Sequence, residues 1–336
     1  MGQCRLTLSL FAFAAFCVTS APAHSLPKSS QLPFAKAQQM VDIGGRRLNL
    51  YCSGEGAVTV VFDAHGGAAA SSWFEVQPAV APYARACVYD RAGMGFSDPS
   101  PRPGTSANAV DDLHQLLGAA RIAPPYILVG SSFGGGNAQL FAWRYRPEVK
   151  GMVLVEPQHE DDSDRLDQVT GGKMKQMQAM QEQMLNACAG QAAKGFVRGS
   201  QWWNTCVRAA PSNRSKALAD SVAALRSTPS YWQANASEQA SFVESNKVLR
   251  AARTPFGDLP LIVLSRAVSP YAIPGGPQSA MNKAVEESNQ ATLAEIAALS
   301  SRASLRKITG AGHIVHEDKP EAVVQAIKEM IHTVTK

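Results

Sequence analysis

The feature that most constrains this chain is the segment Gly-Ser-Ser-Phe-Gly at 130–134, which directly follows the apolar run 126–129. A strand that ends in G-x-S-x-G and turns at once into a helix forms a nucleophile elbow, in which the central serine stands exposed at the top of a sheet. Only Ser132 has a glycine two residues before it and another two residues after it, so it is favoured over Ser131. The segment predicts a strand, a sharp turn and a helix, with Ser132 as the candidate nucleophile.

The N-terminus is typical of a signal peptide. Arg5 precedes an apolar run over 6–18, and Ala-Pro-Ala at 21–23 matches the small-x-small cleavage rule. We therefore expect residues 1–23 to be removed on export to the periplasm or the medium. The apolar run is too short for a stable membrane anchor. A flexible leader is expected over 24–37.

The remaining chain of about 310 residues is long enough for one large α/β domain with an insertion. The formal net charge of the full 336-residue chain is only +5, and no cluster of Lys and Arg stands out. Nucleic-acid binding is therefore not expected.

The cysteines fit an exported protein. Two of the six lie in the expected signal peptide, and four remain: Cys52, Cys87, Cys188 and Cys206. An even number in an oxidising compartment predicts two disulfides, and four cysteines allow three pairings. We favour Cys52–Cys87, on two strands expected to be neighbours, and Cys188–Cys206, closing a local loop. Four free buried thiols are the alternative.

Strand-like and helix-like segments alternate along most of the chain. A hairpin is expected over 39–52, with glycines 44 and 45 at its turn. Further strands are expected at 58–62, 86–89, 126–129, 149–155, 261–264 and 305–309, with helices from 106, over 278–299 and from 320. This alternation predicts a parallel sheet covered on both faces.

The alternation stops over 157–258, where the chain is helical, polar and rich in Met, Gln and Trp. This stretch is too long for an ordinary connection, so we expect a helical cap or lid between two core segments, 38–156 and 259–336. Four methionines recur at spacings of three, three and four, which places them on one helical face: Met174, Met177, Met180 and Met184. Packing against the body of the protein is the expected role of this stripe. The alternative is that it faces the active site, where flexible thioethers would suit an apolar acyl group.

A serine hydroxyl needs a neighbouring base to become nucleophilic. His313 is the favoured base, because the preceding run Gly-Ala-Gly at 310–312 allows a tight loop after the last strand. His316 is the nearby rival. A second base role for His65 is not expected, because it lies in a loop where a structural role is more common.

The base in turn needs a carboxylate to orient it. The loop 265–270, which follows strand 261–264, contains none, and Arg266 there is expected to form a surface salt bridge. Glu156 closes the preceding strand and is the favoured acid. The alternatives, in order, are Asp161 or Asp162 and then Glu286. A simple helix-capping role for Glu156 is also open.

Two backbone N–H groups are needed to bind the oxyanion that develops on a substrate carbonyl. Phe133, directly after the candidate nucleophile, is expected to supply one. The loop after strand 58–62 is expected to supply the other, from Gly66 or Gly67, because glycine lets the backbone approach a ligand closely.

These motifs together resemble the α/β-hydrolase superfamily over nearly all of the mature chain. The resemblance is carried by Val-Tyr-Asp-Arg-Ala-Gly-Met-Gly-Phe-Ser-Asp at 88–98, by 128–135 and by Gly-Ala-Gly-His at 310–313. It implies a mostly parallel eight-stranded sheet in the order 1-2-4-3-5-6-7-8, with helices on both faces and an inserted helical cap. This order places Cys52 beside Cys87. Some capped members carry their acid directly after strand 6, where Glu156 stands.

The resemblance implies serine hydrolase chemistry without a metal or another cofactor. Haloalkane dehalogenases and epoxide hydrolases of this fold use Asp as nucleophile, which Ser132 argues against. We expect hydrolysis of a small, apolar carboxylic ester through an acyl-enzyme on Ser132, with His313 activating water. Amidase, aminopeptidase or lactonase activity with the same residues is an alternative. A protein that keeps the fold only to hold a ligand is another.

Overall fold

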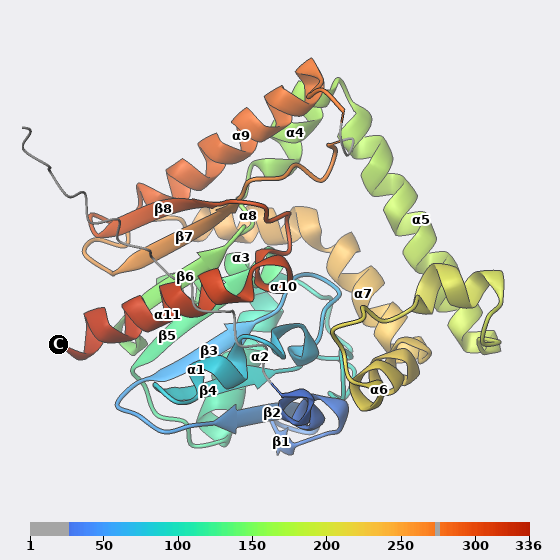
Figure 1. Ribbon diagram of the computed structural model, residues 1–336, viewed down its shortest axis with the longest axis horizontal. Helices are drawn as coiled ribbons and strands as arrows, with labels where there is room; N and C mark the ends of the chain where they lie inside the picture. The colour runs from blue at the N-terminus through green and yellow to red at the C-terminus, as the bar shows by residue number, and fades with distance from the viewer. Residues whose placement is uncertain (1–26, 273–275) are drawn as a thin grey trace, which may run out of the picture.

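One eight-stranded sheet organises the chain, in the order β1-β2-β4-β3-β5-β6-β7-β8 (Figure 1). The computed structural model describes residues 27–272 and 276–336, so the expected signal peptide lies outside the described residues. All pairings from β4 to β8 are parallel, whereas β2 is antiparallel to β1 and β4. The strands are β1 (Gln39–Asp42), β2 (Arg47–Ser53), β3 (Thr59–Asp63), β4 (Arg85–Tyr89), β5 (Tyr126–Ser131), β6 (Val149–Val155), β7 (Leu261–Arg266) and β8 (Ala303–Ile308). The expected fold class and strand order are confirmed.

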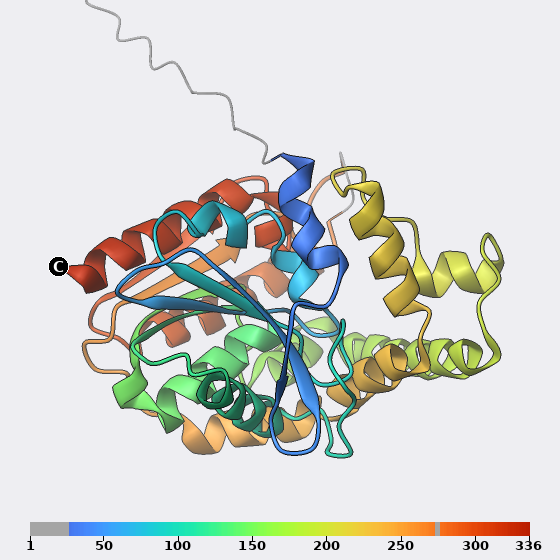
Figure 2. The same ribbon diagram turned by 90° about the horizontal axis from the view of Figure 1, so that it is seen from below.

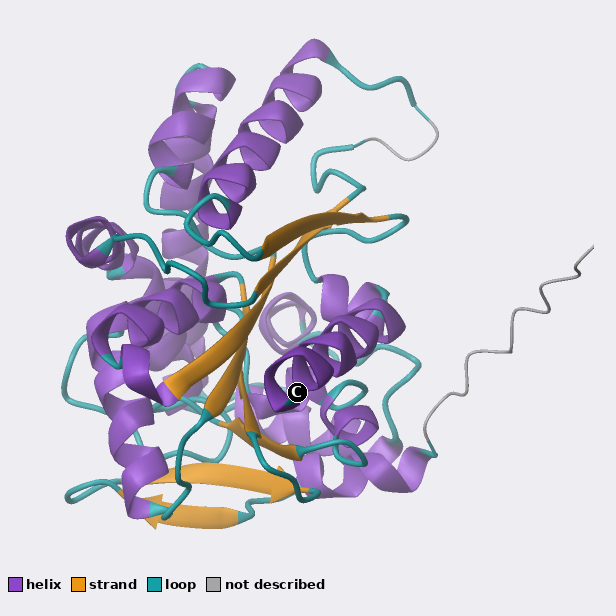
Figure 3. Cartoon of the chain, turned by 90° about the vertical axis from the view of Figure 1, so that its left-hand side faces the viewer, coloured by secondary structure: helices purple, strands orange, loops and turns teal. Residues whose placement is uncertain are grey.

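Helices cover both faces of the sheet, which Figure 3 shows nearly edge-on. One face packs against α1 (Gln77–Val80) and α11 (Pro320–Thr335). The other face packs against α2 (Ser106–Ala119), α3 (Phe133–Arg144), α8 (Phe242–Ala252) and α9 (Ala280–Ala297). Because both faces are buried, the central strands read as continuous apolar runs rather than as alternating ones.

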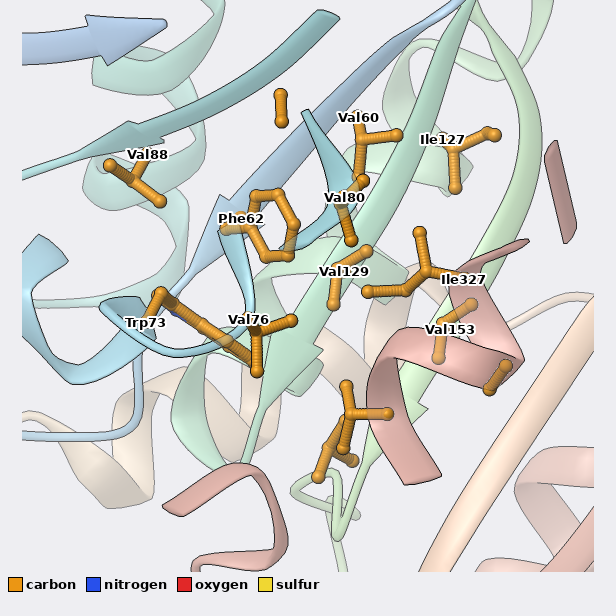
Figure 4. Packing of buried hydrophobic residues seen from close by; sticks show 14 of the residues in the cluster. Val60, Phe62, Trp73, Val76, Val80, Val88, Ile127, Val129, Val153 and Ile327 are labelled. Carbon is orange, nitrogen blue, oxygen red and sulfur yellow. The ribbon is translucent and has the colours of Figure 1, made fainter. Parts of the chain in front are cut away.

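The alternation of side chains along β5 shows how the two cores form. Ile127 and Val129 point to one face, where they lie near Ile327 of α11 (Figure 4). Leu128 points to the opposite face and joins the cluster that contains α2 and α3 residues. All three β5 side chains are buried, so this strand is fixed in register from both sides.

The segment between β6 and β7 is helical, as expected. It contains α4 (Asp162–Thr170), α5 (Lys173–Lys194), the short π-helix η4 (Trp203–Val207), α6 (Lys216–Arg226), α7 (Pro229–Ala240) and α8. Helices α5, α6 and α7 project beyond the sheet (Figures 1 and 2). Helix α8, within the expected cap, instead buries Leu249 in the core cluster shared with α2 and α3. We refer to α4 through α7 as the lid.

The methionine stripe does not pack as expected. Met174 is buried, but the exposed fractions of Met177, Met180 and Met184 are 47%, 69% and 47%. Helix α5 contacts α4 and α7, and nearly every residue from 175 to 184 is exposed. Helix α5 is therefore held by α4 and α7, and no element of the described chain packs over the methionines in its middle part.

The expected flexible leader is also wrong for its described part. Residues Lys28–Ala35 form a 3-10 helix, η1, in which Gln31 and Phe34 are buried. Gln31 donates a hydrogen bond to the carbonyl of Asn213 and accepts one from the N–H of Ser215. Phe34 packs edge-on against Tyr51, with ring centroids 5.5 Å apart. These contacts explain why this polar, proline-containing segment is ordered on the body of the protein.

Both favoured cysteine pairings are confirmed. Cys52 and Cys87 lie directly opposite each other in the antiparallel pair β2·β4 and form a disulfide. Cys188 and Cys206 form a second disulfide that joins α5 to η4 in the lid.

None of the helices within 27–272 and 276–336 combines the length and the apolar character needed to cross a membrane.

Candidate active site

Ser132 occupies a sharp turn between β5 and α3. Its φ of +50° lies in the left-handed region, which non-glycine residues rarely adopt. A Cβ atom at Gly130 would lie 2.2 Å from the carbonyl oxygen of Gly134, and one at Gly134 would lie 2.4 Å from that of Asp63. Both flanking positions therefore require glycine, and the structure has the strand–turn–helix that the motif predicts.

His313 lies on the loop after β8 and reaches Ser132 from a position 181 residues further along the chain. Its Nε2 is 3.1 Å from Ser132 Oγ, and its Nδ1 is 3.3 Å from Glu156 Oε2. The rival His316 is buried and stacks on Trp73 with ring centroids 4.0 Å apart. Burial holds the pKa of His316 well below its ordinary value, so this imidazole is neutral.

Glu156 directly follows β6, has a φ of +46° and is buried. Its carboxylate accepts a hydrogen bond from the backbone N–H of Arg266 at 2.8 Å and another from the guanidinium Nη1 of Arg266 at 2.5 Å. Burial alone would raise the pKa of Glu156, but the hydrogen bond from His313 and the charge of Arg266 lower it below the ordinary value. Glu156 is therefore a carboxylate at neutral pH, and Arg266 is a buried partner rather than the expected surface residue.

The other candidate acids make different contacts. Asp161 pairs with Arg165 and Arg250. Asp162 accepts the backbone N–H of His159, and Glu286 pairs with Arg266 at 3.0 Å. Among the described residues, Glu156 is thus the carboxylate that the structure places against His313.

The two glycines in the loop after β3, Gly66 and Gly67, differ in whether their backbone N–H is free to bind a substrate. The N–H of Gly67 donates to Glu238 Oε2 on α7 at 2.8 Å, so the expectation that Gly67 offers its N–H to a substrate is wrong for this structure. A Cβ atom at Gly66 would lie 3.7 Å from Phe133 Cβ, so Gly66 is next to the residue that follows Ser132. Within the described chain, neither the Gly66 nor the Phe133 N–H has a protein acceptor.

Glu238 belongs to a buried ion network that sequence reasoning missed. Arg91 donates from Nε to Glu238 Oε1 at 2.7 Å and from Nη1 to Asp63 Oδ1 at 2.6 Å. The same guanidinium donates to the carbonyl oxygens of Ala64 and His65. The network therefore joins the lid helix α7 to the loop that carries Gly66. Arg91 lies in the segment 88–98 that the sequence singled out, but its partner Glu238 lies 147 positions further along the chain.

A cavity of about 210 Å³ opens at Ser132 and His313. Its apolar lining comes from Phe133, Phe242 and Ile314, and its amide lining from Gln181, Asn235 and Gln239. We call this the catalytic cavity. A larger hollow of about 410 Å³ lies beneath α7 next to the loop 99–105 and shares Glu238 with it, but Ser132 and His313 do not line this hollow.

One group of potential metal ligands is found in the described part of the chain: His159, Glu160 and Asp161. Arg253 donates to Glu160 at 2.9 Å and contacts His159 Nε2 at 3.2 Å, and Arg250 binds Asp161. Arginines therefore already occupy the ligand atoms that a cation would need.

Comparison with known proteins agrees with the fold described above. The model of a family described as alpha/beta hydrolases matches residues 60–326. The uncharacterized protein C23C11.06c of Schizosaccharomyces pombe is 40% identical over 82 residues, which cover 24% of this chain and 15% of that protein. YqjL of Bacillus subtilis is 35% identical over 104 residues, covering 31% of this chain and 41% of the relative. The chain thus matches less than half the length of either relative.

Solved structures show the same fold at low sequence identity. A thermophilic esterase from Thermogutta terrifontis has a TM-score of 0.57 at 18% identity, covering 90% of this chain and 100% of the esterase. A serine hydrolase involved in carbazole degradation gives 0.57 at 14% identity, with coverages of 88% and 98%. An epoxide hydrolase gives 0.58 at 15% identity, with the same coverages of 88% and 98%.

Proposed function

The chain belongs to the alpha/beta hydrolase family, and from this premise we propose that it is a serine hydrolase that cleaves carboxylic esters. In this proposal Ser132 is the nucleophile, His313 the general base and Glu156 the acid that orients the imidazole. The observation that carries it is the chain of contacts from Ser132 Oγ to His313 Nε2 at 3.1 Å and from His313 Nδ1 to Glu156 at 3.3 Å.

The proposed reaction has two halves. In the first, His313 Nε2 takes the proton of Ser132 as Oγ attacks the ester carbonyl, and the developing oxyanion accepts the N–H groups of Phe133 and Gly66. The protonated imidazole then gives its proton to the departing alcohol, which leaves an acyl group on Ser132. In the second half, His313 deprotonates a water that attacks this acyl group, and the carboxylic acid is released with Ser132 restored.

The surroundings of the candidate triad support this assignment of roles. Glu156 is ionised and fixed by Arg266, so it can hold His313 with Nδ1 protonated and Nε2 free to accept. The apolar side of the catalytic cavity, at Phe133, Phe242 and Ile314, suits the hydrocarbon part of an ester. The lining is only partly apolar, however, because three amide side chains face the same space.

We also propose that the mature protein acts outside the cytoplasm. The N-terminal charge, apolar run and Ala-Pro-Ala site support export. The two disulfides support it as well, because such bonds persist mainly in oxidising compartments.

A labelling experiment tests the nucleophile. The wild-type protein and the variants Ser132→Ala and Ser131→Ala are treated with a fluorophosphonate probe and then assayed on para-nitrophenyl esters of increasing acyl length. Ser131 is a matched control, because it is the adjacent serine, is buried, and its Oγ has no hydrogen-bond partner among the described residues.

We expect labelling and ester hydrolysis to vanish in Ser132→Ala and to persist in Ser131→Ala. Persistent labelling of Ser132→Ala would refute the assignment. Faster turnover of aminoacyl anilides or lactones than of the esters would instead move the substrate class to amides or lactones. Tight ligand binding without any turnover would favour a binding protein.

A further inference from the structure

A second, smaller cavity lies beside the catalytic cavity and shares His65 and Gly67 with it. Its volume is about 40 Å³, and its walls come from the loop after β3, the lid helices α6 and α7, and α10 (Val315–Asp318). We call it the arginine cavity, after Arg214 and Arg226, and its polar lining also includes His65, Ser72 and Glu317.

Three buried polar atoms of these residues lack a partner within the described chain: Arg214 Nε, Ser72 Oγ and His65 Nδ1. The side chain of Arg214 is only 7% exposed. Buried polar groups are almost always hydrogen-bonded in folded proteins, because an unpaired one loses its hydration without compensation. Three such atoms on residues that line one cavity indicate that something polar binds there.

The charges of the cavity favour an anion. Two guanidinium groups line it against the single carboxylate of Glu317, whose Oε1 lies 3.8 Å from Arg214 Nη2, beyond hydrogen-bonding distance. Arg226 lines the same space, and its positive charge acts on Glu317 together with that of Arg214. Burial and then the positive charges around it hold the pKa of His65 at about 3, so this imidazole is neutral. The lining therefore carries a net charge of one positive unit.

The size of the cavity limits the anion. One water needs about 10 to 15 Å³ of such space, so about 40 Å³ accommodates a few waters or one small planar group. A carboxylate is planar and matches the fork of a guanidinium, which binds it through two parallel hydrogen bonds. Larger anions, such as a nucleotide phosphate chain, exceed this volume.

The position of the cavity connects it to the reaction. His65 and Gly67 flank Gly66, which lies against Phe133 beside Ser132. The arginine cavity and the catalytic cavity therefore share a wall, formed by the loop that carries Gly66.

We propose that the arginine cavity binds a free carboxylate of the substrate, so that this hydrolase prefers esters carrying a carboxylate near the scissile bond, such as half-esters of short dicarboxylic acids. The proposal rests on the proposed function, since it assumes that Ser132 attacks an ester.

The test compares two esters that differ in one charge. The para-nitrophenyl half-ester of glutaric acid carries a free carboxylate, and the para-nitrophenyl methyl diester of the same acid is its neutral counterpart. The ratio of kcat/KM for the charged ester to that for the neutral ester is measured in the wild type, Arg214→Gln, Arg226→Gln and the control Arg198→Gln. Arg198 is also a lid arginine, but its side chain is 79% exposed and it does not line the cavity.

We expect the wild type to favour the charged ester and each cavity variant to lower the ratio about tenfold or more, because a charge-assisted hydrogen bond is lost. Arg198→Gln should keep the wild-type ratio, and free glutarate should inhibit competitively in the wild type and more weakly in Arg226→Gln. Thermal unfolding is recorded for each protein, because Arg214 is buried and replacing it can impair folding. If Arg214→Gln does not fold, Arg226→Gln decides the question, because Arg226 is only half-buried.

An unchanged ratio in a folded Arg226→Gln protein would overturn the proposal and leave the cavity as a site for water. So would a wild type that hydrolyses both esters equally. A wild type that hydrolyses neither ester and takes no fluorophosphonate label would instead contradict the proposed function itself.

Discussion

The carboxylate of Glu238 accepts the backbone N–H of Gly67 at 2.8 Å while its other oxygen binds Arg91 at 2.7 Å. Glu238 belongs to lid helix α7, and Gly67 follows Gly66, a proposed donor to the oxyanion. One buried side chain therefore holds both the lid helix α7 and the loop beside Ser132 in position.

Removing this carboxylate should destabilise the protein strongly. In Glu238→Ala, the buried Arg91 keeps only Asp63 as an ionic partner, and the Gly67 N–H loses its acceptor. We expect the free energy of unfolding to fall by about 3 kcal/mol, the usual effect of breaking a buried pair. Urea unfolding followed by circular dichroism measures this change in free energy.

The control Glu244→Ala removes an exposed carboxylate on the neighbouring helix and should change stability by less than about 0.5 kcal/mol. Equal stability of the two variants would contradict the network described here.

Replacing the acid of the proposed triad should reduce turnover far more than it reduces stability. Glu156→Gln keeps the shape of the side chain but cannot hold an imidazolium, so kcat should fall about 1,000-fold to 10,000-fold. Steady-state hydrolysis of para-nitrophenyl acetate is the measurement. Glu286→Gln is the matched control, because Glu286 also binds Arg266 but does not contact His313, and it should keep most of the wild-type kcat. If Glu286→Gln lost more activity than Glu156→Gln, the acid would have been assigned wrongly.

The elbow should not tolerate even one methyl group. Alanine at position 130 or 134 would place a Cβ atom 2.2 or 2.4 Å from a backbone oxygen, and we expect each variant to lose about 3 kcal/mol of stability together with activity. Gly118→Ala is the control, since nothing lies within 4 Å of a Cβ atom there and the residue is in helix α2. It should gain about 0.5 to 1 kcal/mol. Thermal unfolding distinguishes the outcomes, and a stable, active Gly134→Ala protein would rule out the packing described for the elbow.

Asp162 should make stability depend on pH between about 4 and 6. Burial raises the pKa of this carboxyl to about 6, above its ordinary value of 3.8. Between these values the folded protein holds a proton that the unfolded chain has released, so this group's contribution to stability falls as the pH rises. Asp162→Asn removes the titration and keeps an acceptor for the His159 N–H.

Relative to the wild type, Asp162→Asn should therefore gain about 1 kcal/mol or more on going from pH 4 to pH 7. Urea unfolding at both pH values gives this difference, in which the contributions of all other groups cancel. A constant difference between the two proteins would show that the carboxyl titrates at its ordinary pKa.

Local rules explain why so much of the elbow could be predicted. The position of Ser132 depends on glycines two residues away and on the apolar run before it, all within one short segment. The strand assignments followed from apolar runs that are buried on both faces. The absence of a carboxylate in the loop expected over 265–270 pointed to Glu156, and the structure places Arg266, the last residue of β7, against it.

Contacts between distant segments explain what could not be predicted. Glu238 and Gly67 are 171 positions apart, and no local pattern indicates that a lid carboxylate would take a loop N–H. The burial of Gln31 depends on Asn213 and Ser215 in the lid, so a segment with the composition of a leader becomes ordered. The periodicity of the methionines correctly indicated one helical face, but periodicity does not reveal whether a partner covers that face.

The Cys188–Cys206 disulfide has a consequence for proteolysis. It encloses residues 189–205, and Ser132 and Glu156 precede this loop whereas His313 follows it. A protease that cuts the chain inside the loop would leave two fragments that are still covalently joined, with β6 and β7 paired between them. Such a nicked protein would migrate as one species until a reductant is added, and the three residues of the proposed triad would stay in one covalently joined molecule.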